Sequence, residues 1–132
     1  MGAIAVVLDH TAATALHDPK NPHNGAVAAF YVQASGGLGT LYAPVLSLAV
    51  GDSERPGLLA YINGLRSIEV EAFDTQAALT ATELLRAGHS WEAAHAIHAA
   101  RPSAEFPAGR FLLTLTPQAY EGTGVQAVHP DQ

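Results

Sequence analysis

The chain has 132 residues, of which 48% are apolar and 14% charged. This length suits one domain around one core, and the low charge excludes a disordered chain, because enough apolar surface is present to offset the entropy of ordering. The net charge of −6 disfavours binding of nucleic acid through a broad basic surface. The sequence contains no cysteine, which excludes disulfides, thiolate metal sites and thiol nucleophiles.

The apolar segments do not have the pattern of targeting or membrane sequences. The apolar opening has no basic residue before it and reaches Asp9 too soon for a signal peptide. The longest apolar stretch, near residues 41–50, contains Pro44 and Ser47 and is shorter than the roughly 20 residues of a membrane span. We therefore expect a soluble, cytoplasmic protein that does not enter a membrane.

The first half of the chain predicts two buried strands with helices between them. Residues 3–8 form a continuous run of mostly branched apolar side chains, typical of a strand covered on both faces. A second such run, residues 41–48, leads into a helix that begins near Ser47. The expected elements of this half are strands over 3–8 and 41–48, helices over 11–16, 25–33 and 58–65, and a charged turn over 51–57.

The second half begins with the alternating apolar and polar residues 68–73, which predict a half-exposed strand. Asp74 and Ser90 are natural N-caps for the two helices that follow. The expected elements are strands over 68–73, 110–114 and 125–129 and helices over 75–87 and 91–100.

Strands that alternate with helices predict an α/β fold with three layers, in which helices cover both faces of a mostly parallel sheet of four to five strands. We expect a single domain over residues 1–132. Ligand sites of such folds lie beyond the carboxyl ends of the strands. Asp9 directly follows the first strand, so its carboxylate either serves such a site or only caps the next helix. Motifs for phosphate loops and for serine hydrolase elbows are missing from the sequence.

Five short motifs follow one another in a suggestive order. They are Val6-Val7-Leu8-Asp9-His10-Thr11-Ala12, Tyr42-Ala43-Pro44-Val45-Leu46-Ser47-Leu48-Ala49, Glu92-Ala93-Ala94-His95-Ala96-Ile97-His98-Ala99, Leu112-Leu113-Thr114-Leu115-Thr116, and a closing segment from Tyr120 to Val128 that contains the final strand. In this order and spacing the chain resembles PIN domains, the fold of VapC-type toxin nucleases. The resemblance spans nearly the whole chain and implies a single PIN-like domain.

PIN nucleases hold Mg²⁺ or Mn²⁺ with three or four carboxylates, and the ion activates water for phosphodiester hydrolysis. Carried over to this chain, the resemblance makes Asp9 the first acid, with the Thr11 hydroxyl beside it. Glu92 fills the third acidic position, unless a one-residue slip places Ala93 there.

The remaining acidic positions of the motif are not acidic in this chain. The second is Val50, with Asp52 and Glu54 two and four residues later. The fourth acidic position lies at a strand end that corresponds to Thr114–Thr116 in this chain, and Thr116 stands at the acidic position itself. The resemblance therefore implies an acidic cluster that is incomplete, with Asp9, Glu92, Thr11, Thr114 and Thr116 as the remnants of a catalytic site.

Seven histidines are a surplus for a chain of this length. Glu92 and His95 share one helix face, and such a Glu-x-x-His pair binds transition metals in helical proteins. A rebuilt site of Asp9, Glu92 and His95 would favour Zn²⁺ or Mn²⁺ over Mg²⁺. The alternative is that His95 is a partly buried helix residue bonded to its neighbours.

Together these observations predict a PIN-like protein that is non-catalytic or weakly active and binds RNA or regulates a partner. One alternative is a Mg²⁺- or Mn²⁺-dependent endoribonuclease, the toxin of a toxin–antitoxin pair. Another is an α/β domain that binds a small molecule in the strand-end cleft. The resemblance also implies a homodimer, for which Val27, Phe30 and Tyr31 offer an apolar helix face, and RNA or an antitoxin-like protein as partner.

Overall fold

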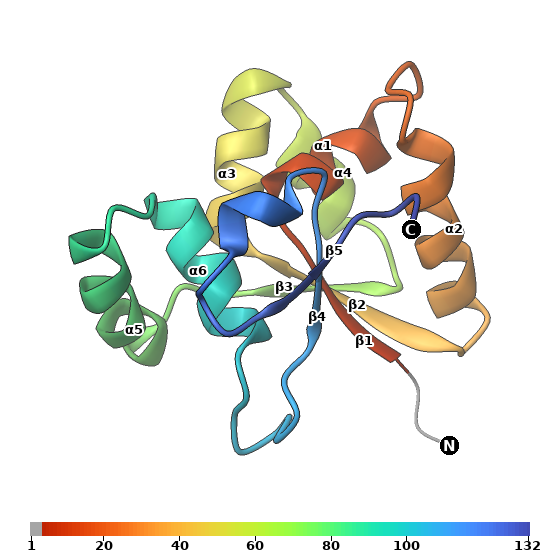
Figure 1. Ribbon diagram of the computed structural model, residues 1–132. Coiled ribbons are helices and arrows are strands. Elements are labelled where there is room, and N and C mark those ends of the chain that lie inside the picture. Colours follow the sequence, from red (N-terminus) through yellow and green to blue (C-terminus); the bar gives the residue numbers. More distant parts are fainter. Residues whose placement is uncertain (1–3) are drawn as a thin grey trace.

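A computed structural model describes residues 4–132 of the chain. Within this range a five-stranded sheet has the order β3-β2-β1-β4-β5, and every neighbouring pair is parallel (Figure 1). This confirms the predicted parallel sheet, with β1 at its centre. The strands are β1 (Ile4–Leu8), β2 (Gly39–Pro44), β3 (Ile68–Glu71), β4 (Phe111–Leu113) and β5 (Gln126–Val128).

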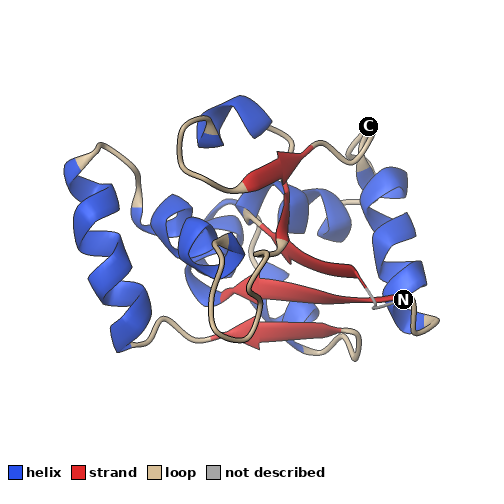
Figure 2. Ribbon diagram, turned by 60° about the horizontal axis from the view of Figure 1, so that its bottom comes forward, coloured by secondary structure: helices blue, strands red, loops and turns tan. Residues whose placement is uncertain are grey.

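Helices cover both faces of this sheet, as Figure 2 shows. One core cluster joins the sheet to α1, α2, α3 and α4, and a second joins the opposite face to α5 and α6. Side chains of β1 alternate between the two clusters, because successive residues of a strand point to opposite faces. The helices are α1 (His10–His17), α2 (Asn24–Ser35), α3 (Val45–Glu54), α4 (Leu58–Asn63), α5 (Thr75–Arg86) and α6 (Trp91–Ala100), and Pro117–Tyr120 form the 3₁₀ helix η1.

Both predicted N-caps are confirmed in the second half of the chain. The side chain of Asp74 accepts a hydrogen bond from the Ala77 amide at the start of α5, and Ser90 does the same for Ala93 at the start of α6. Because α6 connects to a strand parallel with its predecessors, it runs back along the sheet. Its N-terminus therefore lies at the edge where the strands end.

Most predicted boundaries differ by only one or two residues, and the largest difference lies at the second strand. The second strand ends at Pro44 rather than at residue 48, because helix α3 begins at once and continues through most of the expected turn. The closing strand lies within the predicted range 125–129: Tyr120 ends η1, and pairing with β4 covers Gln126–Val128. Ala3, which was expected to open the first strand, lies outside the described residues.

The helix face that we expected to pair two copies of the chain is largely used within the fold. Val27 is completely buried in the first core cluster, and Phe30 and Tyr31 pack partly against it. The prediction that these three side chains form a free pairing surface was wrong for Val27, because α2 needs it to dock onto the sheet. Within residues 4–132, no helix is long and apolar enough to cross a membrane.

Candidate functional site

Asp9 lies at the carboxyl end of the central strand β1 and is only 1% exposed. It is the N-cap of α1, where its Oδ1 atom accepts a hydrogen bond from the Ala12 amide at 3.0 Å. The helix-cap role that the sequence suggested is therefore present. The hydrogen bond that caps the helix uses only part of the accepting capacity of the Asp9 carboxylate, because three hydroxyl groups also donate to it.

The three hydroxyl groups come from distant parts of the chain. Thr11 donates to Oδ1 of Asp9 at 2.6 Å. Thr114 and Tyr120 donate to Oδ2 at 2.6 and 2.8 Å. Each carboxylate oxygen of Asp9 thus accepts two hydrogen bonds, and the buried charge is compensated without a cation.

Backbone amides fix the direction of two of these hydroxyl groups. The Thr11 oxygen accepts a hydrogen bond from the Leu115 amide at 2.9 Å, and the Thr114 oxygen accepts one from the Thr116 amide at 3.1 Å. A hydroxyl that accepts from an N–H presents its own proton elsewhere, here to Asp9. The segment after β4 therefore orients the donors around this carboxylate. Thr116 reaches the network by a 3.3 Å contact with the hydroxyl of Thr114.

Tyr120 completes the network from the last position of η1 and is 4% exposed. Burial raises the pKa of the Tyr120 hydroxyl, and the adjacent charge of Asp9 and its hydrogen bond raise it further. The phenol is thus a fixed proton donor. Tyr120 opened the closing motif of the resemblance and was given no role in the site, although a phenol in a buried segment signals a donor that requires an acceptor.

Glu92 lies at the N-terminal end of α6 and is partly exposed. Its charge contributes to the raised pKa of Tyr120, so Glu92 is within electrostatic reach of the hydroxyl that contacts Asp9. The same edge of the sheet therefore carries both predicted acids. Ligand atoms of Asp9, Glu92 and His95 do not gather within 4.8 Å of one another in the part of the chain that the structure describes.

His95 is 1% exposed and lies in the interior next to Phe73, with the two ring centroids 5.1 Å apart. Its Nδ1 atom accepts a hydrogen bond from the Leu46 amide at 3.4 Å, and its ring also lies near the backbone of Ala72. Burial lowers the pKa of His95 to about 4. At neutral pH the imidazole is thus an uncharged link between α6, α3 and the end of β3.

The resemblance implies a second acidic position, at which this chain has no carboxylate. Val50 occupies it on α3 and is partly buried. Asp52 accepts a hydrogen bond from the Leu59 amide at 3.0 Å and so caps the start of α4. Glu54 is exposed at the end of α3.

A separate cavity of about 450 Å³ lies on the α5 and α6 side of the sheet. Arg110, 8% exposed, forms part of its wall and makes two 3.0 Å hydrogen bonds to the Glu71 carboxylate. The Arg110 guanidinium also lies over the rings of Tyr42 and Phe106, at 4.3 and 4.5 Å from their centroids. His95 and His98 line the same cavity.

No protein-family model and no curated protein matches this sequence. Solved structures of similar fold include the following two. The first is VapC20 of Mycobacterium tuberculosis, described as a Sarcin-Ricin loop cleaving toxin: 14% sequence identity over 70% of this chain and 78% of that one, TM-score 0.56. The second is VapBC2 of Rickettsia felis, bound to a DNA fragment from its promoter: 15% identity over 96% and 98% of the two chains, TM-score 0.59.

The parallel sheet order, the two helical layers and these similarities agree. The chain has a VapC-like PIN-domain fold. This confirms the fold that the sequence motifs predicted.

Proposed function

We propose that this chain is a non-catalytic PIN-fold protein that acts by binding a partner and not by hydrolysing phosphodiester bonds. The observation that carries the proposal is the closed environment of Asp9. This carboxylate is buried, and both of its oxygens already accept two hydrogen bonds each. In a metal-dependent nuclease the corresponding oxygens must be free to bind a cation.

The donor set around Asp9 does not fit Mg²⁺ or Mn²⁺. Hard cations of this kind take about six oxygen ligands and are held mainly by carboxylates, waters and substrate phosphate. Here hydroxyl groups of Thr114 and Tyr120 occupy Oδ2 of Asp9, and Val50 replaces a carboxylate. A bound cation would leave the buried Tyr120 hydroxyl without its acceptor, at a cost of about 1–3 kcal/mol. The residues around Asp9 therefore do not support hydrolysis through a bound metal ion.

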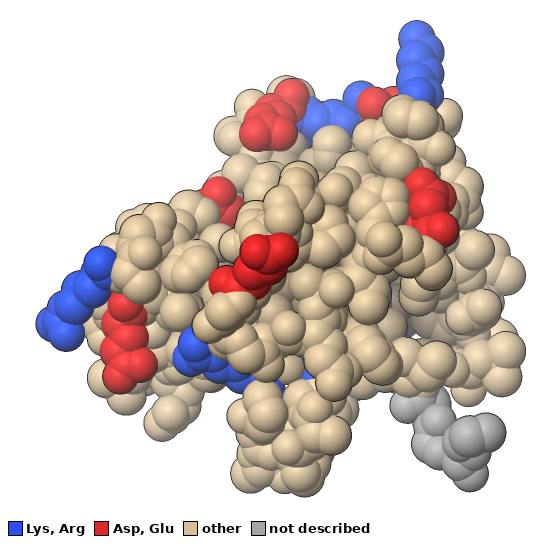
Figure 3. Space-filling view, viewed as in Figure 1, with Lys and Arg blue, Asp and Glu red and all other residues tan. Residues whose placement is uncertain are grey.

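The charge distribution favours a protein partner over RNA. The net charge is −6, and the basic side chains on the face seen in Figure 3 lie apart from one another, mostly at its margins. A continuous basic surface, which binding of a phosphate backbone requires, is not present on that face of the described residues. The proposed partner is a regulatory protein of the antitoxin kind. We also propose that two copies of this chain form a homodimer.

A cleavage assay tests the proposal. Untagged protein is incubated with structured RNA and either Mg²⁺ or Mn²⁺, next to the variants Asp9→Asn and Asp74→Asn prepared in parallel. Asp74 is a suitable control because it also caps a helix through its Oδ1 atom but lies far along the chain from the network. We expect no cleavage above background in any sample. Cleavage by the wild type and by Asp74→Asn, but not by Asp9→Asn, would establish the nuclease alternative instead.

The cavity beside Arg110 supports a second candidate, a small-molecule binding protein. Its volume of about 450 Å³ lies within the usual range of ligand pockets, and its wall combines aromatic and charged side chains. This site is on the α5 and α6 side and not in the strand-end cleft that the sequence suggested. A thermal-shift screen with small metabolites tests this candidate, since a true ligand raises the melting temperature of the wild type. The same ligand should not raise the melting temperature of Glu105→Trp, because the larger side chain fills the cavity from its exposed wall.

A further inference from the structure

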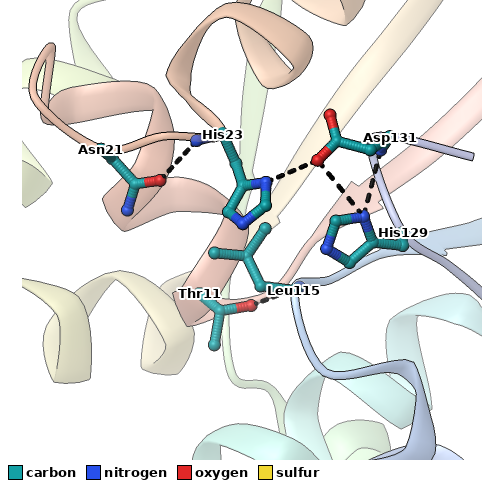
Figure 4. A network of polar contacts seen from close by, with 6 residues as sticks. All are labelled: Thr11, Asn21, His23, Leu115, His129 and Asp131. Atoms are coloured by element: carbon teal, nitrogen blue, oxygen red, sulfur yellow. Dashed lines mark hydrogen bonds and ion pairs between the residues drawn. The ribbon is translucent and has the colours of Figure 1, made fainter.

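Two histidines and a carboxylate meet at a place that the Asp9 network does not use. His23 Nδ1 lies 2.6 Å from Oδ2 of Asp131, and His129 Nδ1 lies 3.8 Å from the same oxygen. The centroids of the two imidazole rings are 4.9 Å apart, with their planes nearly perpendicular. Figure 4 shows both rings directed toward the Asp131 carboxylate.

The fold brings these side chains together from opposite ends of the sequence. His23 immediately precedes α2, and its backbone amide is tied to the side chain of Asn21 at 2.8 Å. His129 immediately follows β5, and its Nδ1 atom accepts a hydrogen bond from the Asp131 amide at 3.1 Å. The cluster thus has a defined geometry on each side. Any ion bound by all three residues would connect the start of α2 to the segment after β5.

This donor set has the chemistry and spacing that could hold a metal ion. One ligand atom from each of His23, His129 and Asp131 lies within 4.8 Å of the others, and this is the one such group of three among residues 4–132. Metal–ligand bonds of about 2.0–2.1 Å in a tetrahedral site place ligand atoms about 3.3 Å apart, so shifts of about 1 Å suffice. The side chains are 30%, 20% and 52% exposed, which allows both the shifts and entry of an ion.

Imidazole and carboxylate ligands favour Zn²⁺ and similar transition metals over Mg²⁺. Coordination through Nδ1 of His129 would replace its hydrogen bond with the Asp131 amide, which is exposed and can bond to water instead. A hydrogen bond joins His23 to Asp131, and the bond from the Asp131 amide holds His129 beside the same carboxylate, so both imidazoles are already placed next to it. The overall charge of −6 also favours cation binding.

We propose that His23, His129 and Asp131 bind one Zn²⁺ ion, with water completing its coordination, and that this ion fastens the segment after β5 to the start of α2. The site is separate from the Asp9 carboxylate. It goes beyond the proposed binding function and does not depend on it.

The test uses untagged protein, because a histidine tag would itself bind zinc. Isothermal titration with ZnCl₂ should give one ion per chain, and excess zinc at about 100 times the dissociation constant should raise the melting temperature by about 5–10 °C. His129→Ala and Asp131→Asn should each lower the zinc affinity by more than about a hundredfold, a larger loss than follows removal of a residue that only orients a ligand. Each variant is compared with its own metal-free melting temperature, so that a change in basal stability does not affect the result.

His89→Ala is the matched control, because His89 lies in the turn between α5 and α6 and is also partly exposed. It should keep the full zinc response, as should Asp9→Asn. Absence of zinc binding in the wild type, or an unchanged response in both His129→Ala and Asp131→Asn, would overturn the proposal. A response to Mg²⁺ that Asp9→Asn abolishes would instead contradict the proposed function and leave the zinc site intact.

Discussion

The hydroxyl of Tyr120 donates a 2.8 Å hydrogen bond to Oδ2 of Asp9, and 111 residues of sequence separate the two. Both side chains are buried, at 4% and 1% exposure. The contact closes the carboxyl end of the central strand with a proton donor, at the place where a PIN nuclease would hold a cation. It therefore connects the stability of the fold with the absence of the hydrolytic site that we propose.

Tyr120→Phe should lower the free energy of unfolding by about 1–3 kcal/mol, because it keeps the ring but removes one donor to a buried carboxylate. Urea denaturation measures the change. Tyr31→Phe is the control, since Tyr31 is only partly buried on α2 and should change stability by less than about 0.5 kcal/mol. Equal effects of the two substitutions would show that the hydrogen bond to Asp9 contributes no more to stability than the hydroxyl of a partly buried tyrosine.

Asp9→Asn should cost about 1–3 kcal/mol, although Asn and Asp are equally good N-caps. The loss is expected because the amide NH₂ of Asn replaces an oxygen that accepts two hydrogen bonds. Asp74→Asn removes the charge of another N-cap, whose side chain is exposed, and should be nearly neutral. Chemical denaturation of both variants decides the matter, and a neutral Asp9→Asn would contradict the network.

His95 predicts a loss of stability in acid. Because burial lowers its pKa from 6.5 to about 4, the unfolded chain binds a proton between these values and the native protein does not. Stability from this residue is therefore complete above about pH 6.5 and falls as the pH decreases toward 4, by about 3 kcal/mol in total.

Urea unfolding at several pH values between 4 and 7.5 measures this dependence. His95→Gln should flatten the profile relative to the wild type, whatever its effect at neutral pH. His89, which lies in the turn between α5 and α6 and is not among the groups that shift the pKa of His95, provides the control, and His89→Gln should keep the wild-type slope. A parallel decrease in the wild type and His95→Gln would show that other groups carry the acid sensitivity.

Arg110→Lys should lower the free energy of unfolding by about 2–3 kcal/mol. Lysine keeps the charge but cannot make both hydrogen bonds to Glu71, the bond to the Ala99 carbonyl and the contacts with two aromatic rings at once. Arg86→Lys, at an exposed position near the end of α5, should be neutral when measured in the same denaturation experiment. A neutral Arg110→Lys would mean that the charge alone is sufficient.

Much of the fold could be predicted from local patterns. Apolar runs identified the buried strands, and Asp74 and Ser90 marked helix starts correctly, because a side-chain cap depends on only a few neighbouring residues. The end of β2 was misplaced because residues 45–48 are apolar in either structure, and periodicity does not separate a buried strand from a buried helix.

The environment of Asp9 was harder to predict. Thr11 and Thr114 were identified as site residues through the family resemblance, but their hydrogen bonds to one carboxylate depend on how β1 and β4 pair. Tyr120 was not recognised, because its position is set by η1 and not by a strand. The His23, His129 and Asp131 cluster likewise joins residues that no sequence spacing relates.

The most direct test of the central claim follows the Ala12 amide, which is hydrogen-bonded to Asp9, by NMR during titration with Mg²⁺. The His129→Ala variant is used, so that the proposed zinc site does not contribute. We predict no change in the Ala12 amide shift up to about 10 mM Mg²⁺, about ten times the dissociation constant of the weakest protein sites for hard divalent cations. A saturable shift at Ala12 that disappears in Asp9→Asn would show that Asp9 binds the cation and would contradict the account.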